Sequence, residues 1–186
     1  MSERGTNLYF AYGSNLHPLR LGLRTPQCRQ LGTATLSGYR LRFHKRSDGD
    51  GSAKADAHRT GEAADRVHGV VYAMADDEIP VLDDIEGLGP GGYEVRTETL
   101  TLGGEPRMVF LYTAVTSHVD PHGRPFAWYR DLVWHGARWQ GFPGDYVAAI
   151  GAVAAGDDPD PARRAKNERL LEAMPGWHPD HGYHLP

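Results

Sequence analysis

The sequence predicts an α+β fold. Predicted strands dominate the first 114 residues, one helix is inserted among them, and predicted helices fill the rest of the chain. The regular alternation of strand and helix that builds a doubly wound parallel sheet is absent, and no internal repeat is present. A length of 186 residues suits one ordinary hydrophobic core, so we expect a single domain over residues 1–186, with a C-terminal helix and tail in 151–186.

Two strands are predicted in the N-terminal quarter. Residues 7–13 alternate between two faces, as a strand does, and residues 31–44 alternate around Gly38, which predicts one bent strand or a bulge. Residues 45–66 are polar and indicate a loop. A loop of that length is unusual inside a compact domain, so we expect a short hidden strand near residues 52–57.

A buried strand and a short helix follow. Residues 67–74 are almost entirely apolar, which is typical of a buried strand. Residues 77–86 have apolar side chains at helical spacing, with Asp77 as the expected N-cap and Pro80 in the first turn, where proline is tolerated. Gly87 is expected to end this helix.

A hairpin and three helices complete the prediction. Residues 93–102 and 107–114 both alternate, and the GGE between them indicates a β-hairpin. The last helix has Asp160 as its N-cap and Pro161 at its first position. The three helices are predicted over residues 126–140, 145–155 and 160–173.

Charge is unevenly spread along the chain, whose net charge is −4. Residues 5–47 contain seven cations and no Asp or Glu, whereas residues 48–106 carry fourteen acids against four cations. A basic stretch can bind nucleic acid, but no run of Lys and Arg exceeds two residues and no nucleic-acid motif accompanies it. We therefore expect the two segments to pair within one fold, and we expect no nucleic-acid partner.

The apolar segments and the cysteine content bear on the compartment. No run of eighteen apolar residues is present, so no membrane span is expected. The first ten residues, MSERGTNLYF, lack the apolar region of a signal peptide, and the single Cys28 excludes an intramolecular disulfide. These features predict a cytoplasmic protein.

The first candidate site is the turn Gly13-Ser14-Asn15 after the first strand. Backbone N–H groups at a strand-to-helix turn can converge on an anion, glycine lets a ligand approach the backbone, and Ser and Asn add side-chain donors. The turn matches neither a P-loop nor a dinucleotide-binding fingerprint. On spacing alone, a simple strand-ending turn is the better explanation of these residues.

Glu86 is the second candidate, at the last turn of the helix predicted over 77–86. A carboxylate there faces the negative end of the helix dipole, and Asp83 three residues earlier is expected to repel it. Both effects disfavour the charged form, as a general acid and base near neutral pH requires. The alternative is a solvated acid in an acidic helix.

The remaining candidates are weaker. The C-terminal His178, His181 and His184 resemble a zinc-binding tract in their spacing, but the tract is terminal and has a single carboxylate, so we expect no native metal site. Cys28 could act as a nucleophile, although a lone cysteine is more often a small apolar filler. A triad based on Ser14 has no GxSxG motif to support it.

Several of these motifs together resemble one family, the γ-glutamylcyclotransferases, also called AIG2-like proteins. The resemblance covers about residues 7–150, and its two main motifs are specific in combination although each is short. The matching stretches are FAYGSN, GSAKADA, VHGVVY, LDDIEG, GGYEVR and the segment from Pro125 to Ile150. GSN in place of GSL looks less like the glutathione-specific branch.

The resemblance implies a fold, a reaction and a site. The family fold is a small, mostly antiparallel β-barrel with surrounding helices, and its members cleave γ-glutamyl amides by cyclisation, releasing 5-oxoproline without a metal or organic cofactor. The catalytic Glu of the family matches Glu86. The substrate-binding positions match Tyr12, Gly13, Ser14, Asn15 and Tyr93.

The identity of the leaving group stays open at this point. It is either an amino acid, or an amine or biosynthetic intermediate, and the family fold alone does not decide between them. A non-catalytic binding module on the same fold is a further alternative. It predicts Glu86 in a structural salt bridge away from the Gly13 turn. Neither the oligomeric state nor the role of residues 151–186 follows from the sequence.

Overall fold

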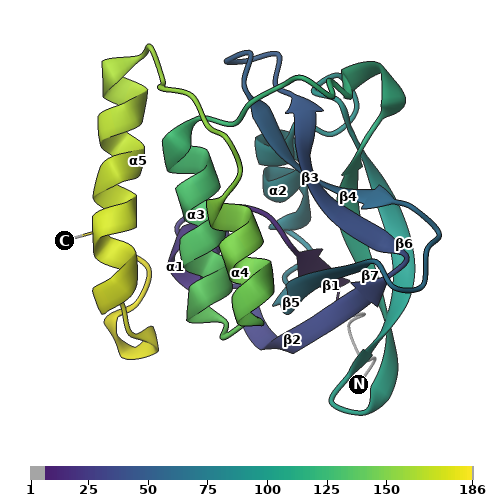
Figure 1. Cartoon of the computed structure of the whole chain (residues 1–186). Coiled ribbons are helices and arrows are strands. Elements are labelled where there is room, and N and C mark those ends of the chain that lie inside the picture. The colour runs from purple at the N-terminus through teal and green to yellow at the C-terminus, as the bar shows by residue number, and fades with distance from the viewer. Residues whose placement is uncertain (1–6, 186) are drawn as a thin grey trace.

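The structure is a computed structural model that describes residues 7–185. Its strands form a curled half-barrel, which consists of a five-stranded sheet in the order β2-β5-β1-β7-β6 and a two-stranded sheet β3-β4 (Figure 1). The strands are β1 (Asn7–Ala11), β2 (Arg29–Ser37), β3 (Tyr39–Arg46), β4 (Ala53–Arg59), β5 (Arg66–Met74), β6 (Tyr93–Leu102) and β7 (Glu105–Ala114). The predicted α+β class, with a mostly antiparallel barrel-like sheet, is confirmed.

β1 lies at the centre of the larger sheet. It pairs antiparallel with β5, with Tyr9 opposite Tyr72, and parallel with β7, where Tyr9 faces Phe110. Phe10 and Ala11 have no exposed surface, so the end of β1 is held inside the core. The turn that follows β1 therefore begins at the end of a buried strand.

Gly38 divides two strands where the sequence predicted one bent strand. β2 ends at Ser37 and belongs to the five-stranded sheet, whereas β3 begins at Tyr39 and pairs only with β4. Gly38 adopts a φ of 80°, a conformation that glycine adopts without strain, and the chain changes sheet there. The prediction of one strand over 31–44 is wrong, while the hidden strand expected near 52–57 is confirmed as β4.

The hairpin β6–β7 closes at a two-residue turn. Gly103 and Gly104 have φ values of 61° and 86°, and such positive values are typical of the turns that match the twist of paired strands. Ten residues of each strand then pair in register, from Tyr93 opposite Ala114 to Leu102 opposite Glu105.

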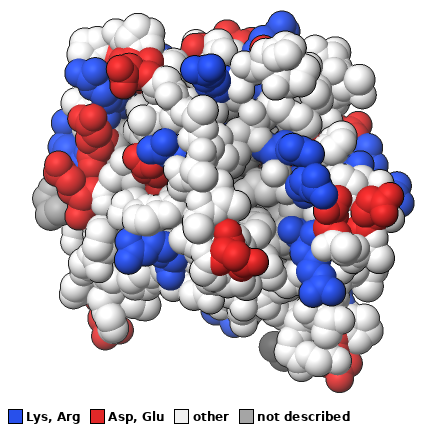
Figure 2. Space-filling model, in the orientation of Figure 1, with Lys and Arg blue, Asp and Glu red and all other residues white. Residues whose placement is uncertain are grey.

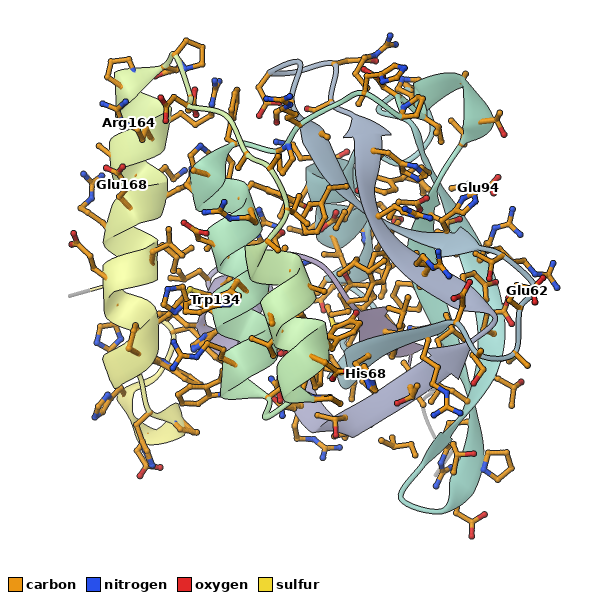
Figure 3. The ribbon with its side chains drawn as sticks, in the orientation of Figure 1. Glu62, His68, Glu94, Trp134, Arg164 and Glu168 are labelled. Carbon is orange, nitrogen blue, oxygen red and sulfur yellow. The ribbon has the colours of Figure 1, made fainter. Side chains whose placement is uncertain are left out.

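Five α-helices accompany the sheets in residues 7–185. α3, α4 and α5 lie side by side on one side of the half-barrel, with α3 in contact with both of the others (Figure 1). The helices are α1 (Pro18–Gly22), α2 (Ile79–Glu86), α3 (Ala127–Trp139), α4 (Gly144–Gly151) and α5 (Pro161–Ala173). His68 of β5 packs edge-on against Tyr146 of α4, which holds this helix beside the sheet (Figure 3).

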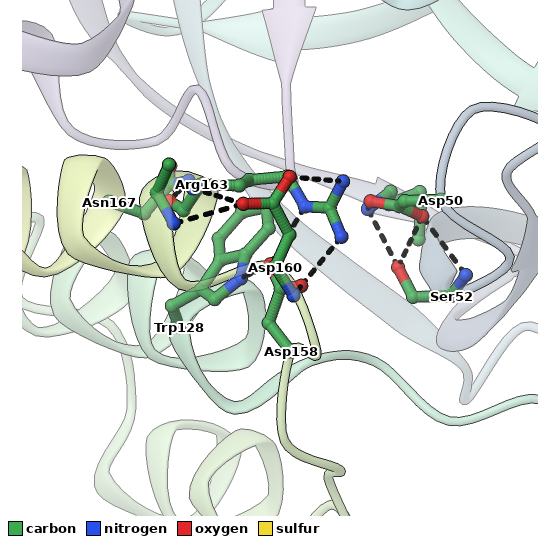
Figure 4. Close-up of polar contacts among 9 residues, drawn as sticks. Asp50, Ser52, Trp128, Asp158, Asp160, Arg163 and Asn167 are labelled. Atoms are coloured by element: carbon green, nitrogen blue, oxygen red, sulfur yellow. Dashed lines mark hydrogen bonds and ion pairs between the residues drawn. The ribbon is translucent and has the colours of Figure 1, made fainter.

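The segment before α5 ties this helix to α3. The Asp158 carboxylate accepts hydrogen bonds from Trp128 Nε1 at 2.8 Å and from the Arg163 guanidinium at 2.6 and 2.7 Å (Figure 4). Asp160 caps α5 as predicted, because its side chain accepts from the N–H groups of Ala162 and Arg163.

The C-terminal residues pack onto the rest of the fold. Leu170, Met174 and Trp177 belong to the main core cluster. The Trp177 ring contacts His17 and Trp139, at centroid distances of 5.7 and 5.6 Å. Residues 151–185 therefore complete the core on the α1–α3 side, a role that the sequence left open.

The start of α2 differs from the prediction. The N-cap is Glu78, not Asp77, and its side chain makes no capping bond; one Glu78 oxygen accepts instead from Gln27 N at 2.7 Å. Gly87 ends the helix as expected, with a φ of 70°. This left-handed residue leaves Glu86 at the C-terminal end of α2.

Charges of both signs are mixed over the face in Figure 2. The basic and acidic segments meet in ion pairs such as Arg24 with Glu86 and Arg40 with Asp65, in agreement with the prediction that the two segments pair within the fold. Within residues 7–185, no helix is long and apolar enough to cross a membrane.

Candidate active site

The Gly13-Ser14-Asn15 turn joins β1 to α1. Its first residue accepts a hydrogen bond through its carbonyl oxygen from Leu16 N at 3.2 Å, which closes the turn. A Cβ at Gly13 would lie 3.1 Å from the Cβ of Ala55 and 3.7 Å from the hydroxyl oxygen of Tyr129. A side chain at this position would therefore be crowded by Ala55 of β4, and Tyr129 of α3 lies close by.

Glu86 lies against this turn, although the two are far apart in the sequence. The side-chain amide of Asn15 donates to Glu86 Oε1 at 2.8 Å and lies 3.2 Å from the hydroxyl oxygen of Tyr9. Asn15 itself is 2% exposed, so the contact sits inside the protein. The end of β1 and the end of α2 thus converge on one carboxylate.

Two charged side chains lie near Glu86. Asp83 Oδ1 accepts a hydrogen bond of 2.6 Å from the hydroxyl of Tyr112, which lines the same pocket as Glu86. Arg24, which the sequence analysis did not consider, places a guanidinium nitrogen 3.6 Å from Glu86 Oε1. Glu86 therefore has a cation beside it as well as the negative end of the α2 dipole.

Most of these residues line one pocket that opens to solvent. Two tyrosines of its wall form hydrogen bonds with the backbone of Ala55. The Tyr93 hydroxyl donates to the Ala55 carbonyl oxygen at 2.6 Å, and the Tyr129 hydroxyl accepts from Ala55 N at 3.1 Å. The lining residues are Tyr9, Tyr12, Gly13, Ser14, Asn15, Ala55, Glu86, Tyr93, Tyr112 and Tyr129. Its hydroxyl, amide and carboxylate groups suit a small polar molecule.

The pocket tyrosines remain protonated near neutral pH. Burial raises the pKa of Tyr129 to about 12, and the charge of Glu86 adds to this effect. Burial likewise raises the pKa values of Tyr12 and Tyr93 well above the ordinary value for tyrosine. Their hydroxyls therefore orient groups by hydrogen bonds, and Glu86 is the one carboxyl group among the lining residues.

Two backbone donors of the turn are available to a ligand. Within the described part of the chain, the structure shows no acceptor for the N–H groups of Ser14 and Asn15. An N–H group without an acceptor in the protein can donate to a bound molecule, so an acceptor on a ligand would stabilise this turn.

All six residues predicted from the sequence line the pocket: Tyr12, Gly13, Ser14, Asn15, Glu86 and Tyr93. Their chemical roles remain predictions. Sequence reasoning missed Tyr9, Arg24, Ala55, Tyr112 and Tyr129. Tyr9 alternates with Phe10 in the same motif and could have been found, but Arg24 and Tyr129 reach the site only through packing.

The other candidates lie outside this pocket. Burial raises the pKa of Cys28 to about 11, so its thiol is a poor nucleophile near neutral pH. Within residues 7–185, the three-residue group that could hold a metal ion is His44, Asp56 and His58, not the C-terminal histidines. Its carboxylate is already engaged by His44 Nε2 at 2.8 Å and by Ala114 N at 2.7 Å.

A family model and curated relatives indicate one family. The family model described as "Gamma-glutamyl cyclotransferase, AIG2-like" matches residues 9–131. The chain is 30% identical over 158 residues to a γ-glutamylcyclotransferase of Homo sapiens, with 81% of this chain and 80% of the human protein covered. It is 31% identical over 159 residues to the γ-glutamylcyclotransferase of Mus musculus, with the same coverage.

A solved structure extends the likeness to three dimensions. The chain superposes on a structure of a γ-glutamyl cyclotransferase with a TM-score of 0.78 and 25% sequence identity, over 90% of this chain and 99% of the other. About nine-tenths of this chain therefore has a structural counterpart there.

Proposed function

The chain belongs to the γ-glutamylcyclotransferase, AIG2-like family, and from this premise we propose that the pocket between the Gly13 turn and Glu86 is its active site. The enzyme cleaves γ-glutamyl amides by intramolecular cyclisation and releases 5-oxoproline and a free amine or amino acid. The roles of individual residues below are our proposal.

The reaction needs positioning more than activation. The α-amine of a γ-glutamyl substrate attacks its own γ-carbonyl carbon, and a five-membered ring forms as the amide C–N bond breaks. Because the nucleophile is tethered to the electrophile, holding the chain in a bent conformation accounts for much of the acceleration. A small pocket with rigid walls of buried tyrosines suits this task.

Glu86 transfers the proton. It accepts a proton from the attacking amine and then donates one to the departing nitrogen, so that general base and general acid are the same residue. The Asn15 amide and the Arg24 guanidinium orient its carboxylate on one side. The protonated tyrosines around it cannot serve as the base near neutral pH.

The turn holds the negative charge of the substrate. The N–H groups of Ser14 and Asn15 bind either the α-carboxylate of the glutamyl group or the oxyanion that develops on the γ-carbonyl oxygen. Both tasks use the same preorganised donors, and the buried end of β1 keeps them in place.

The observation that carries this proposal is the 2.8 Å contact of Asn15 with Glu86, which joins the two sequence motifs in one pocket. Glu86→Gln keeps the shape of the side chain and removes the proton acceptor. We expect the rate of 5-oxoproline release to fall about 10²- to 10⁴-fold, the range typical of a lost general base. Glu168→Gln, on the outer face of α5 (Figure 3), is the matched control.

A wild-type rate of 5-oxoproline release by Glu86→Gln would refute the assignment of Glu86. A panel of γ-glutamyl amino acids and γ-glutamylamines then identifies the leaving group. The non-catalytic alternative predicted Glu86 in a structural salt bridge away from the Gly13 turn. The ion pair of Glu86 with Arg24 lies beside this turn, which counts against that alternative.

We expect the enzyme to work in the cytoplasm on small molecules, without nucleic-acid partners. The support is the buried, unpaired Cys28 and the mixed charges of the surface (Figure 2). Fractionation of cells and measurement of salt-sensitive binding to DNA and RNA test these two expectations.

A further inference from the structure

Lys45 is a buried cation next to the pocket. Lys45 is only 4% exposed. Its Nζ lies 4.5 Å from the ring centroid of Tyr93, and Tyr93 lines the pocket. Within residues 7–185 the structure shows no ion pair of this ammonium group with any carboxylate, and no hydrogen bond from Nζ. Among the described residues, the ammonium group makes a cation–π contact with the ring of Tyr93.

Lys54 provides a direct comparison. It lies opposite Lys45 in the β3–β4 ladder, so two like charges face each other across the strands, an arrangement that is unfavourable by itself. Lys54, however, has hydrogen-bond partners for its ammonium group. Its Nζ donates to Asp50 Oδ2 and to Ser52 Oγ, both at 2.8 Å. Only one lysine of this pair has an acid partner.

The carboxylates close to Lys45 interact with other side chains. Asp50 accepts hydrogen bonds from Lys54 and Ser52 (Figure 4). Asp48 accepts a hydrogen bond of 3.0 Å from His118 Nε2, and Arg46 lies 3.6 Å away from it. Lys45 therefore carries a charge that the described residues do not neutralise directly.

An ammonium group in a largely buried residue loses part of its hydration. A carboxylate on a bound ligand would compensate for that loss. Burial lowers the pKa of Lys45, and the negative charges of Asp48 and Glu86 act against that change. The contact with Tyr93, which lines the same pocket as Glu86, places the Lys45 ammonium beside that pocket.

We propose that Lys45 binds the carboxylate of the leaving amino acid and thereby selects γ-glutamyl amino acids over γ-glutamylamines. The inference rests on the proposed function. A γ-glutamyl amino acid carries two carboxylates, and a γ-glutamylamine carries one. The Gly13 turn, on β1, supplies donors for the glutamyl half. Lys45, on β3 beside Tyr93, supplies a separate cation for the other half.

The test compares two substrates that differ only in this carboxylate. γ-Glutamyl-alanine and γ-glutamyl-ethylamine share the glutamyl group and the carbon chain of the leaving group. Lys45→Met keeps the unbranched side chain and removes the charge. We expect kcat/KM for γ-glutamyl-alanine to fall about ten- to a hundredfold, as for a lost charge-assisted hydrogen bond, while kcat/KM for γ-glutamyl-ethylamine stays within about twofold.

The discriminating quantity is the ratio of the two kcat/KM values within one variant, which does not depend on the fraction of enzyme that is folded. Lys45→Arg retains the charge and should retain the preference for γ-glutamyl-alanine. Lys166→Met, at an exposed position of α5, is the matched control and should change neither value.

One result would overturn the role of Lys45 alone: an unchanged ratio of the two kcat/KM values in Lys45→Met, whether or not both values fall. If the wild-type enzyme released 5-oxoproline from neither substrate, the proposed function would fail and the role of Lys45 would fail with it. The two failures are therefore distinguishable.

Discussion

Arg24 orients the side chain of Asn15. One guanidinium nitrogen of Arg24 donates to Asn15 Oδ1 at 3.0 Å, which turns the amide nitrogen of Asn15 towards Glu86. The orientation of a buried amide is thus specified at both ends, by a donor on its oxygen and by an acceptor on its nitrogen. The consequence is a carboxylate at Glu86 with one oxygen already held, and this geometry leads to the first prediction.

Asn15→Asp should impair the enzyme while retaining its fold. The new carboxylate keeps its contact with Arg24 but repels Glu86 and loses the donor to it. We expect kcat to fall about ten- to a hundredfold, as for a charge-assisted hydrogen bond. Steady-state release of 5-oxoproline measures this, and Asn167→Asp on α5 is the control. Unchanged kcat would show that Asn15 does not orient the catalytic group.

Gly13→Ala should narrow the pocket. The added Cβ would lie 3.1 Å from the Cβ of Ala55, tighter than an ordinary contact, so the turn or β4 must shift by a few tenths of an ångström. We expect a decrease of about tenfold or more in kcat/KM, because such small displacements of reacting groups are costly. Gly144→Ala is the matched control, since no atom lies within 4 Å of its Cβ position. Equal kinetics of the two variants would contradict the prediction.

Tyr129→Phe should destabilise the fold as well as the site. The Tyr129 hydroxyl is the acceptor for the buried Ala55 N–H group, which would be left without a partner. We expect a loss of about 1–3 kcal/mol in the free energy of unfolding. Tyr146→Phe is a matched control, because the Tyr146 hydroxyl has no hydrogen-bond partner within residues 7–185. Chemical denaturation of both variants decides the matter, and equal stability would contradict this role of Tyr129.

Trp177→Ala should weaken the whole protein if, as we propose, residues 1–186 form one cooperative domain. Trp177 is 7% exposed and packs on His17, Trp139 and Tyr183. A large-to-small change of this kind typically costs about 3–5 kcal/mol. Calorimetry should show a single transition that moves to lower temperature, whereas Leu185→Ala at an exposed position should leave it in place. Two separate transitions would contradict the single-domain proposal.

His17 should make the stability depend on pH. Burial lowers the pKa of His17 to about 4 in the folded protein, against 6.5 for an ordinary histidine. Between these values the unfolded chain binds more protons, so the free energy of unfolding decreases as the pH falls from about 7 to 4. The full contribution is up to about 3 kcal/mol.

His17→Gln should therefore lose less stability than the wild type over this pH range, and denaturant titrations at several pH values measure the difference. His184→Gln, at an exposed position, serves as the control and should follow the wild type. Parallel pH profiles for the wild type and His17→Gln would exclude His17 as the responsible group.

Local sequence signals accounted for most of the elements. The caps of α5, the glycine that ends α2 and the hairpin around Gly103 all follow from short-range chemistry, and each was predicted. The errors occurred where distant segments decide. Asp77 looks like a cap, but Glu78 is drawn to the backbone of Gln27, and Gly38 marks a change of sheet that only strand pairing determines.

The candidate site divides in the same way. The sequence by itself determined which residues carry the chemistry, because a glycine turn and a carboxylate at a helix end are visible as short motifs, and their combination resembles one family. Only the tertiary structure decided what surrounds them: Arg24 beside Glu86, Tyr129 and Tyr93 on the backbone of Ala55, and an unneutralised Lys45 behind Tyr93. The physical reason is that electrostatic and packing effects depend on distance in space, and residues 38 to 74 positions apart in the chain become neighbours only when the sheets close.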